Sequence, residues 1–294
     1  MYQNFIEMTK KEHLPNQSLQ IPKVITFTAK LLQAFSSKLA TLFAVKLFTT
    51  PLKHSIPKRE IYMEQNSQQE KLWIPNINKE IQLYHYGKCK KKILLVHGWS
   101  GRGTQLVKIA DELLQNGFST LSFDAPAHGK SSGKTTIMTE FIASILEIEK
   151  QFGPFEFAIG HSLGGMSILN AVKQKFSINK AVIIGSGDLI QDILNEFVLK
   201  LKLNPEIAFK MKEYFEKKYN EDMENYAASF VAQSVEIPVM IIHDQHDNDI
   251  SVKAAHNIHR NLKYSNLLIT ENLGHRKILG DKKVIDSIIK FISK

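Results

Sequence analysis

Hydrophobic residues in this chain gather in short continuous runs that alternate with longer stretches of helical periodicity. The runs predict strands over residues 71–74, 80–86, 92–96, 119–123, 155–159, 180–184, 238–243 and 266–270. The stretches between them predict helices over residues 105–115, 136–152, 166–172, 252–262 and 283–292. Continuous apolar runs are typical of strands buried on both faces of a parallel sheet. The alternation predicts an α/β fold, with a leading antiparallel hairpin and helices on both faces of a mostly parallel sheet.

A helix is also predicted over residues 21–48, which contain no glycine and no proline after Pro22. One apolar stripe recurs there at helical spacing, made of Phe27, Leu31, Phe35, Leu39 and Leu42. Lys38 and Lys46 lie near the stripe, so we expect either a bend at Ser36–Ser37 or lysine side chains that snorkel. We expect the stripe to pack on the body of the protein. Contact with a membrane surface is the less favoured alternative.

Residues 189–235 interrupt the alternation of strands and helices. They carry helical patterns over residues 190–203, 205–219 and 221–233, with no strand between them. We interpret this segment as an inserted helical lid. The predicted organisation is an N-terminal helical extension over residues 1–57, a core made of residues 58–188 and 236–294, and the lid over residues 189–235.

Composition narrows the class of protein. The chain has 294 residues, 43% of them apolar, which is enough for one large domain with an insertion. The single cysteine, Cys89, cannot form an internal disulfide, and no leader is visible near the N-terminus, so a cytoplasmic location is expected. The net charge is +9, but the lysines are scattered and only four arginines are present. A solvated surface is therefore favoured over binding to nucleic acid.

The clearest chemical motif lies at Gly160-His161-Ser162-Leu163-Gly164. It follows a predicted strand directly and precedes a predicted helix, which is the context of the G-x-S-x-G nucleophile elbow. So sharp a turn strains the serine backbone and requires neighbours without bulk, hence the two glycines. Ser162 is therefore the candidate nucleophile. The backbone N–H of Leu163, at the start of a helix, is a candidate donor to an oxyanion.

A serine nucleophile needs a base, usually an imidazole, and an acid that orients it. Asp244, Asp247 and Asp249 all follow the strand over residues 238–243, and spacing alone does not choose between them. A carboxylate four residues past the strand has room to fold back toward a histidine, which favours Asp247. Asp244 and Asp249 are expected to cap turns or to be solvated.

Eleven histidines compete for the role of base. His161 lies inside the elbow with its side chain turned elsewhere, and His97 and His128 belong to glycine turns. His275 comes last in the chain, after a further strand and a glycine. The order serine, acid, histidine and the positions at strand ends agree with a site at the carboxyl edge of the sheet. We therefore favour His275 as the base.

Three further patterns bear on the chemistry. The turn His97-Gly98-Trp99-Ser100-Gly101 follows a strand, so the backbone N–H of Trp99 is a candidate second oxyanion donor. The histidines and aspartates of residues 243–249 could also be metal ligands. Their position in a single loop at a strand end already explains why they are clustered, so no metal or cofactor is predicted. Residues 128–135 end like a phosphate-binding loop, yet neither register has the required first glycine, so nucleotide binding is disfavoured.

Together these segments resemble the α/β-hydrolase superfamily, most closely its bacterial single-domain hydrolases grouped with serine aminopeptidases and carboxylesterases. The motifs that carry the resemblance are His97-Gly98-Trp99, Asp124-Ala125-Pro126-Ala127-His128-Gly129, Gly160-His161-Ser162-Leu163-Gly164-Gly165, residues 243–247 and Gly274-His275. Ala127 stands where such families usually have glycine, which slightly strains that turn. The resemblance covers about residues 70–294 and, more loosely, the helix within residues 21–57. It implies a triad of Ser162, Asp247 and His275, with Trp99 and Leu163 forming the oxyanion hole.

These observations predict a serine hydrolase that cleaves a small-molecule carboxylic ester through an acyl-enzyme. Apolar residues of the predicted lid suggest a pocket for an apolar acyl group, namely Phe197, Leu199, Leu203, Phe209 and Phe215. An aminopeptidase or amidase with the same triad is the enzymatic alternative. A non-catalytic protein that binds a membrane surface or an acidic partner through residues 21–48 and its lysines is the alternative of another class.

Overall fold

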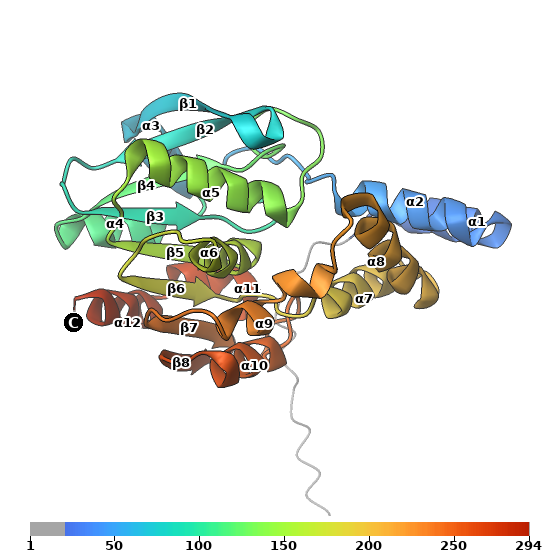
Figure 1. Ribbon diagram of the computed structural model, residues 1–294. Coiled ribbons are helices and arrows are strands. Elements are labelled where there is room, and N and C mark those ends of the chain that lie inside the picture. The colour runs from blue at the N-terminus through green and yellow to red at the C-terminus, as the bar shows by residue number, and fades with distance from the viewer. Residues whose placement is uncertain (1–20, 294) are drawn as a thin grey trace, which may run out of the picture.

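The computed structural model describes residues 21–293, in which one eight-stranded sheet forms the centre of the molecule (Figure 1). The strand order is β1-β2-β4-β3-β5-β6-β7-β8. The strands are β1 Gln68–Ile74, β2 Lys79–Tyr86, β3 Lys92–Val96, β4 Ser119–Asp124, β5 Phe157–His161, β6 Lys180–Ile184, β7 Val239–Asp244 and β8 Ser265–Thr270. β1 and β2 pair antiparallel, β2 is antiparallel to β4, and all other neighbours are parallel. The predicted mostly parallel sheet is confirmed.

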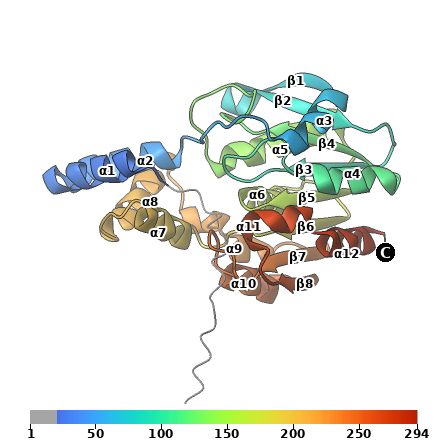
Figure 2. The ribbon, with the colours of Figure 1, turned by 180° about the vertical axis from the view of Figure 1, so that it is seen from behind.

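Helices cover both faces of this sheet, each above its own hydrophobic core. One face carries α5 Met138–Phe152, α6 Leu163–Lys173, α9 Ala228–Ala232 and α10 Lys253–Asn261 (Figure 1). The other carries α3 Lys58–Asn66, α4 Val107–Gln115, α11 Gly274–Lys277 and α12 Lys282–Ile292, seen in front in Figure 2. The two layers confirm the predicted α/β-hydrolase architecture.

The parallel register brings the ends of several strands to one edge of the sheet. Val96 pairs with Gly160, His161 pairs with Ile184, and Asp244 pairs with Thr270. The loops that leave β3, β5, β7 and β8 therefore start close to the same level, as expected for sites on open α/β sheets.

Four further helices form a cap beyond that edge of the sheet (Figure 1). They are α1 Lys23–Phe35, α2 Ser37–Phe48, α7 Ile190–Lys200 and α8 Glu206–Tyr219. Their inward residues make a hydrophobic cluster of their own, which includes Ala29, Ala40, Leu194 and Met211. The N-terminal helices thus pack on the inserted helices, and we call this four-helix unit the cap. Within residues 21–293, no helix is both long and apolar enough to cross a bilayer.

The N-terminal helix has the bend at Ser36–Ser37 that was one of the two predicted alternatives, but its apolar stripe does not pack as expected. It is interrupted at Ser36, whose extended backbone (φ −163°) ends α1 and whose hydroxyl accepts a hydrogen bond from Leu39 N at the start of α2. The apolar stripe was expected to pack inward, and this is wrong. Phe27 and Phe35 are 69% and 79% exposed, because the small residues Ala29 and Ala40 face the cap core and permit close helix packing.

Three other segments were mispredicted. No element was predicted over residues 58–66, but they form α3, which buries Met63 against the sheet. The third lid helix, expected over residues 221–233, is a 3₁₀ turn over Met223–Tyr226 followed by the short α9. The loop after β8 contains the short helix α11, in which His275 lies. The expectation that no leader lies near the N-terminus concerns positions outside the described residues.

Gly164 offers a test of how closely α6 approaches the strand beside it. A Cβ atom at Gly164 would lie 2.3 Å from Val96 O, whereas one at the exposed Gly280 would have its nearest neighbour at 3.9 Å. We expect Gly164→Ala to lower the free energy of unfolding by about 3 kcal/mol through this overlap. Gly280→Ala is the control and should leave stability nearly unchanged. Urea denaturation of both variants decides, and equal stabilities would contradict the packing described here.

Candidate active site

Ser162 occupies the turn between β5 and α6 in a strained backbone conformation. Its φ of +52° and ψ of −119° lie in a region that residues with a side chain rarely adopt. The turn is held in place by the Ser162 N–H, which donates to Ile184 O at 2.8 Å. The neighbouring glycines are sterically required, since a Cβ at Gly160 would lie 2.6 Å from the Gly164 backbone. The predicted sharp elbow is therefore present.

Asp247 and His275 form a hydrogen-bonded pair beside this turn. His275 Nδ1 lies 2.6 Å from Asp247 Oδ2, and the Asp247 side chain is only 1% exposed. Asp247 Oδ1 accepts from the backbone N–H groups of Asp249 and Ile250 at 2.8 and 3.0 Å. Burial acts to raise the pKa of Asp247, but the hydrogen bond and charge of His275 and these two donors outweigh it and lower the pKa. A carboxylate at this position holds the proton of His275 on Nδ1, which leaves Nε2 free to accept one.

His275 is fixed by contacts on two sides of its backbone. His161 donates from Nε2 to His275 O at 2.9 Å, and the two rings lie 4.6 Å apart between centroids. Asp244 Oδ2 accepts from Leu273 N at 3.0 Å and thereby holds the residues that lead into α11. The sequence predicted that the His161 side chain is turned away from catalysis. The structure adds that this side chain positions the His275 peptide through its hydrogen bond to His275 O.

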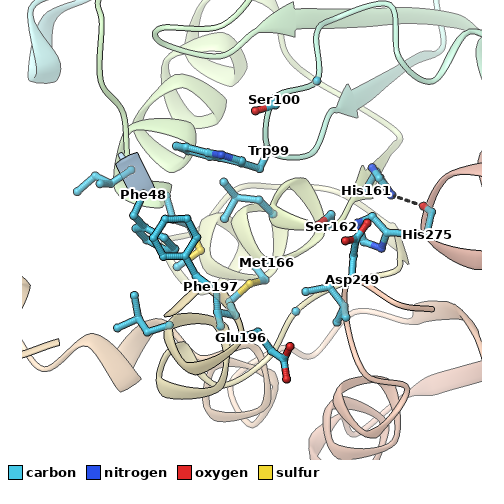
Figure 3. Close-up of a pocket in the computed structure, with 18 of the residues that line it drawn as sticks. Phe48, Trp99, Ser100, His161, Ser162, Met166, Glu196, Phe197, Asp249 and His275 are labelled. Carbon is cyan, nitrogen blue, oxygen red and sulfur yellow. Dashed lines mark hydrogen bonds between the residues drawn. The ribbon is translucent and has the colours of Figure 1, made fainter. Parts of the chain in front are cut away.

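Ser162 and His275 both line one cavity at the edge of the sheet (Figure 3). The Ser162 N–H donates a hydrogen bond to Ile184 O. Gly185, which follows Ile184, lies beside the His275 ring, since a Cβ at Gly185 would be 3.2 Å from His275 Nδ1. The structure thus brings the three predicted residues to one place. Among residues 21–293, however, no hydrogen bond joins Ser162 Oγ to the His275 ring.

The two other candidate acids point elsewhere. Asp244 is fully buried and accepts from Thr270 Oγ1 and two backbone N–H groups. Burial acts to raise its pKa, but the hydrogen bonds, led by that from Leu273 N, lower it. Asp249 forms an ion pair of 3.0 Å with Lys200 of the cap. Of the three aspartates only Asp247 contacts His275, a distinction that spacing in the sequence did not provide.

The same loop carries the histidines considered as metal ligands. His243 is buried and donates from Nε2 to Ile250 O at 3.0 Å, and burial lowers its pKa. Within the described part of the chain, no three His, Cys, Asp or Glu side chains converge as metal ligands do.

Two backbone N–H groups near Ser162 have no acceptor within residues 21–293. They belong to Trp99, in the turn after β3, and to Leu163, the first residue of α6. A Cβ at Gly98 would lie 3.0 Å from Ser162 Cβ, so the Trp99 turn touches the serine. The first N–H groups of a helix lack intrahelical partners and can bind an anion. Both predicted oxyanion donors are therefore free to receive a negative oxygen.

Two buried histidines hold the Trp99 turn in position. His97 Nε2 accepts from Ala125 N, and His128 Nε2 accepts from Ser100 N, both at 3.0 Å. Each ring donates from Nδ1 to a carbonyl, Gly98 O and Pro126 O respectively. Burial lowers the pKa of His97 to about 4, and burial with the nearby His97 lowers that of His128 to about 3. Both rings are therefore neutral at pH 7. Ala127, in the turn before His128, has a φ of +66°, which is the strain expected where related families have glycine.

The cavity has a volume of about 1290 Å³ and extends from Ser162 beneath the cap (Figure 3). The cap supplies apolar walls that include Phe48, Phe197 and Phe215. Of the five lid residues predicted to form an acyl pocket, Phe197 and Phe215 line it. Leu199 and Phe209 are 66% and 56% exposed, because they lie on outward faces of α7 and α8, and Leu203 packs into the cap core.

Comparisons with known proteins agree with this architecture. A sequence model described as the alpha/beta hydrolase fold matches residues 91–237. An esterase from Pyrococcus furiosus has a similar structure, with a TM-score of 0.65, 16% identity and coverage of 83% of this chain and 97% of that chain. An esterase from Exiguobacterium antarcticum is similar with a TM-score of 0.59 and 16% identity, and the match covers 76% of this chain and 99% of that chain. A membrane phospholipase A, described as a bacterial virulence factor, is similar with a TM-score of 0.61 and 14% identity, and the match covers 91% of this chain and 97% of that chain. At these identities the likeness concerns the fold. No curated protein matches the sequence significantly.

The buried neutral histidines predict acid sensitivity. An unfolded histidine has a pKa of about 6.5, so below that pH the unfolded chain takes up protons that folded His97 excludes until about pH 4. The free energy of unfolding therefore falls as pH is lowered through this window, by about 2 kcal/mol from His97 between about pH 7 and 5.

Urea unfolding at the two pH values measures this effect. In His97→Gln the fall in the free energy of unfolding from pH 7 to pH 5 should be smaller than in the parent by about 2 kcal/mol. The variant should be less stable than the parent at both pH values. His256 is exposed and its ring has no hydrogen bond among the described residues, so His256→Gln should show the full loss of the parent protein. An unchanged pH dependence in His97→Gln would rule out a neutral buried ring.

Proposed function

Because the chain belongs to the alpha/beta hydrolase fold family, we propose that it is a serine hydrolase that cleaves a carboxylic ester through an acyl-enzyme. The observation that carries the proposal is the buried Asp247–His275 hydrogen bond of 2.6 Å at the cavity that Ser162 lines from its strained turn. A base oriented by an acid, beside a serine that lines a cavity from an elbow, is the arrangement that makes a hydroxyl nucleophilic. Esterases among proteins of similar fold are consistent with this reaction.

In the first half of the reaction, Ser162 Oγ attacks the carbonyl carbon of the ester and its proton passes to His275 Nε2. Asp247 keeps the other ring proton on Nδ1 and stabilises the imidazolium that forms. The carbonyl oxygen becomes negative and accepts hydrogen bonds from the N–H groups of Trp99 and Leu163. The bond to the leaving oxygen then breaks, and His275 returns the proton to that oxygen to release the alcohol.

In the second half, water takes the place of the alcohol. His275 Nε2 removes a proton from the water as it attacks the acyl carbon, and the same two N–H groups hold the oxyanion. Collapse of this intermediate returns the proton to Ser162 Oγ and releases the acid. The reaction requires a contact between Ser162 Oγ and His275 that forms fully with substrate bound, as is common for catalytic hydrogen bonds that are long in the free enzyme.

The cavity walls support an ester with an apolar acyl group as the substrate class. The aromatic side chains of Phe48, Phe197 and Phe215 line the same cavity as Ser162, and such walls favour an acyl chain by the hydrophobic effect. An aminopeptidase or amidase with the same triad would differ by releasing an amine. Parallel assays on matched ester and amide substrates separate the two reactions.

Ser162→Ala tests the nucleophile. We expect it to abolish both hydrolysis of a short-chain nitrophenyl ester and labelling by a fluorophosphonate probe, since no oxygen remains to form the covalent bond. Thermal unfolding should show that the fold is retained. Ser251 also lines the cavity, and Ser251→Ala should leave both readouts intact. Undiminished turnover or labelling in Ser162→Ala would remove the serine mechanism and would favour a non-catalytic protein.

Asp247→Asn tests the acid. An amide cannot hold the ring proton on Nδ1, so we expect kcat to fall by about 10⁴. Asp249→Asn, whose carboxylate pairs with Lys200, should reduce kcat by less than about tenfold because it loses only a partly exposed ion pair. Steady-state kinetics on the nitrophenyl ester give the ranking. A larger loss in Asp249→Asn than in Asp247→Asn would reassign the acid.

A further inference from the structure

The cap has an exposed apolar surface along α1 and α2. It consists of Val24, Phe27, Leu31 and Phe35 on α1 and Leu39 and Leu42 on α2. Their exposed fractions range from 41% to 79%. Within each helix, successive members are three or four positions apart, which is the spacing of one face of a helix. We call these six residues the outer face.

Packing among residues 21–293 does not account for the outer face. The opposite side of the same helices already packs on α7 and α8, through Ala29, Ala40, Ala44 and Val45. The inner side also packs large residues, among them Leu32 and Phe43. The side chains of the outer face are therefore left directed to water. Contiguous exposed apolar patches usually mark a surface that binds a protein or a membrane.

The charges around the outer face identify the kind of partner. Four lysines lie on α1 and α2, at positions 23, 30, 38 and 46, and all four are exposed. No aspartate or glutamate occurs between Glu12 and Glu60. Within residues 21–293 none of the four lysines forms a salt bridge. The surface therefore combines apolar side chains with positive charge that is not compensated locally.

From these observations we infer that the outer face binds the surface of a bilayer containing anionic lipids. Helices of 13 and 12 residues are too short to span a bilayer, which requires about 20 residues. They suit the interfacial mode, in which apolar side chains enter the headgroup region and flanking lysines meet anionic headgroups. A second copy of the chain is a poorer partner, because joining two outer faces would bring their lysines together.

Membrane binding in this orientation would place the cavity near the lipid. The inner side of α1 and α2 contributes Ile25, Leu47 and Phe48 to the walls of the cavity. The same two helices thus separate the outer face from the space that leads to Ser162. Binding itself makes no use of Ser162, so the inference stands independently of the proposed reaction.

Co-sedimentation of the full chain with vesicles tests the inference. Vesicles of phosphatidylcholine with an equal amount of phosphatidylglycerol should bind the protein, vesicles of phosphatidylcholine alone should bind it at least about tenfold more weakly, and salt should reduce the difference. Phe27→Ser with Phe35→Ser should weaken binding by about tenfold or more through lost apolar burial. Lys30→Glu with Lys38→Glu should do the same through lost attraction.

Matched variants elsewhere on the surface serve as controls. Trp73→Ser with Tyr264→Ser removes two aromatic side chains that are 52% and 50% exposed, and Lys88→Glu with Lys90→Glu makes the same charge change on exposed lysines. Both should bind vesicles as the parent does, and Ser162→Ala should too. Three outcomes would overturn the inference: no binding to the anionic vesicles, equal loss in the controls, or a lipid-free dimer that Phe27→Ser with Phe35→Ser dissociates.

Discussion

The close approach of the start of α6 to the end of β3 is the constraint on which the rest of the site depends. Gly164 lies so near Val96 O that no side chain fits between them, and Gly98 lies against Ser162. This contact brings two separate turns of the chain together. One turn contributes the hydroxyl of Ser162 and the N–H of Leu163, and the other contributes the N–H of Trp99. The polar groups of the site are thus positioned by backbone packing, before any interaction between their side chains.

Histidines around this contact differ in function because their surroundings differ. His97 and His128 are buried between backbone groups, and their lowered pKa values keep the rings neutral, so each can accept one backbone N–H and donate to one carbonyl. His161 is likewise buried, and burial holds its pKa well below the usual range while it supports His275 O. Of these four rings, only that of His275 has a carboxylate on Nδ1. Environment rather than residue type thus separates supporting rings from the candidate base.

Much of the core could be predicted from the sequence because buried parallel strands are short, apolar and bounded by turns. Lys92–Val96 and Lys180–Ile184 have the predicted limits. The choice of Asp247 rested on how far a loop can reach, which spacing in the sequence only suggests. Its contact with His275 depends on tertiary structure and could not be read from the sequence. The orientation of α1 was not predictable from its stripe. Periodicity shows that a helix has an apolar side, but the alanines on its other side, Ala29 among them, determine which side approaches α7 and α8.

The separate hydrophobic cluster of the cap has a mechanical consequence. Ala29, Ala40, Leu194 and Met211 hold four helices to one another through contacts that are largely their own, while the sheet is packed by two other clusters. Units with their own core open and close as cooperative bodies. A displacement of the cap as one body would have to break the ion pair between Lys200 of the cap and Asp249 of the loop after β7, but it need not melt any helix.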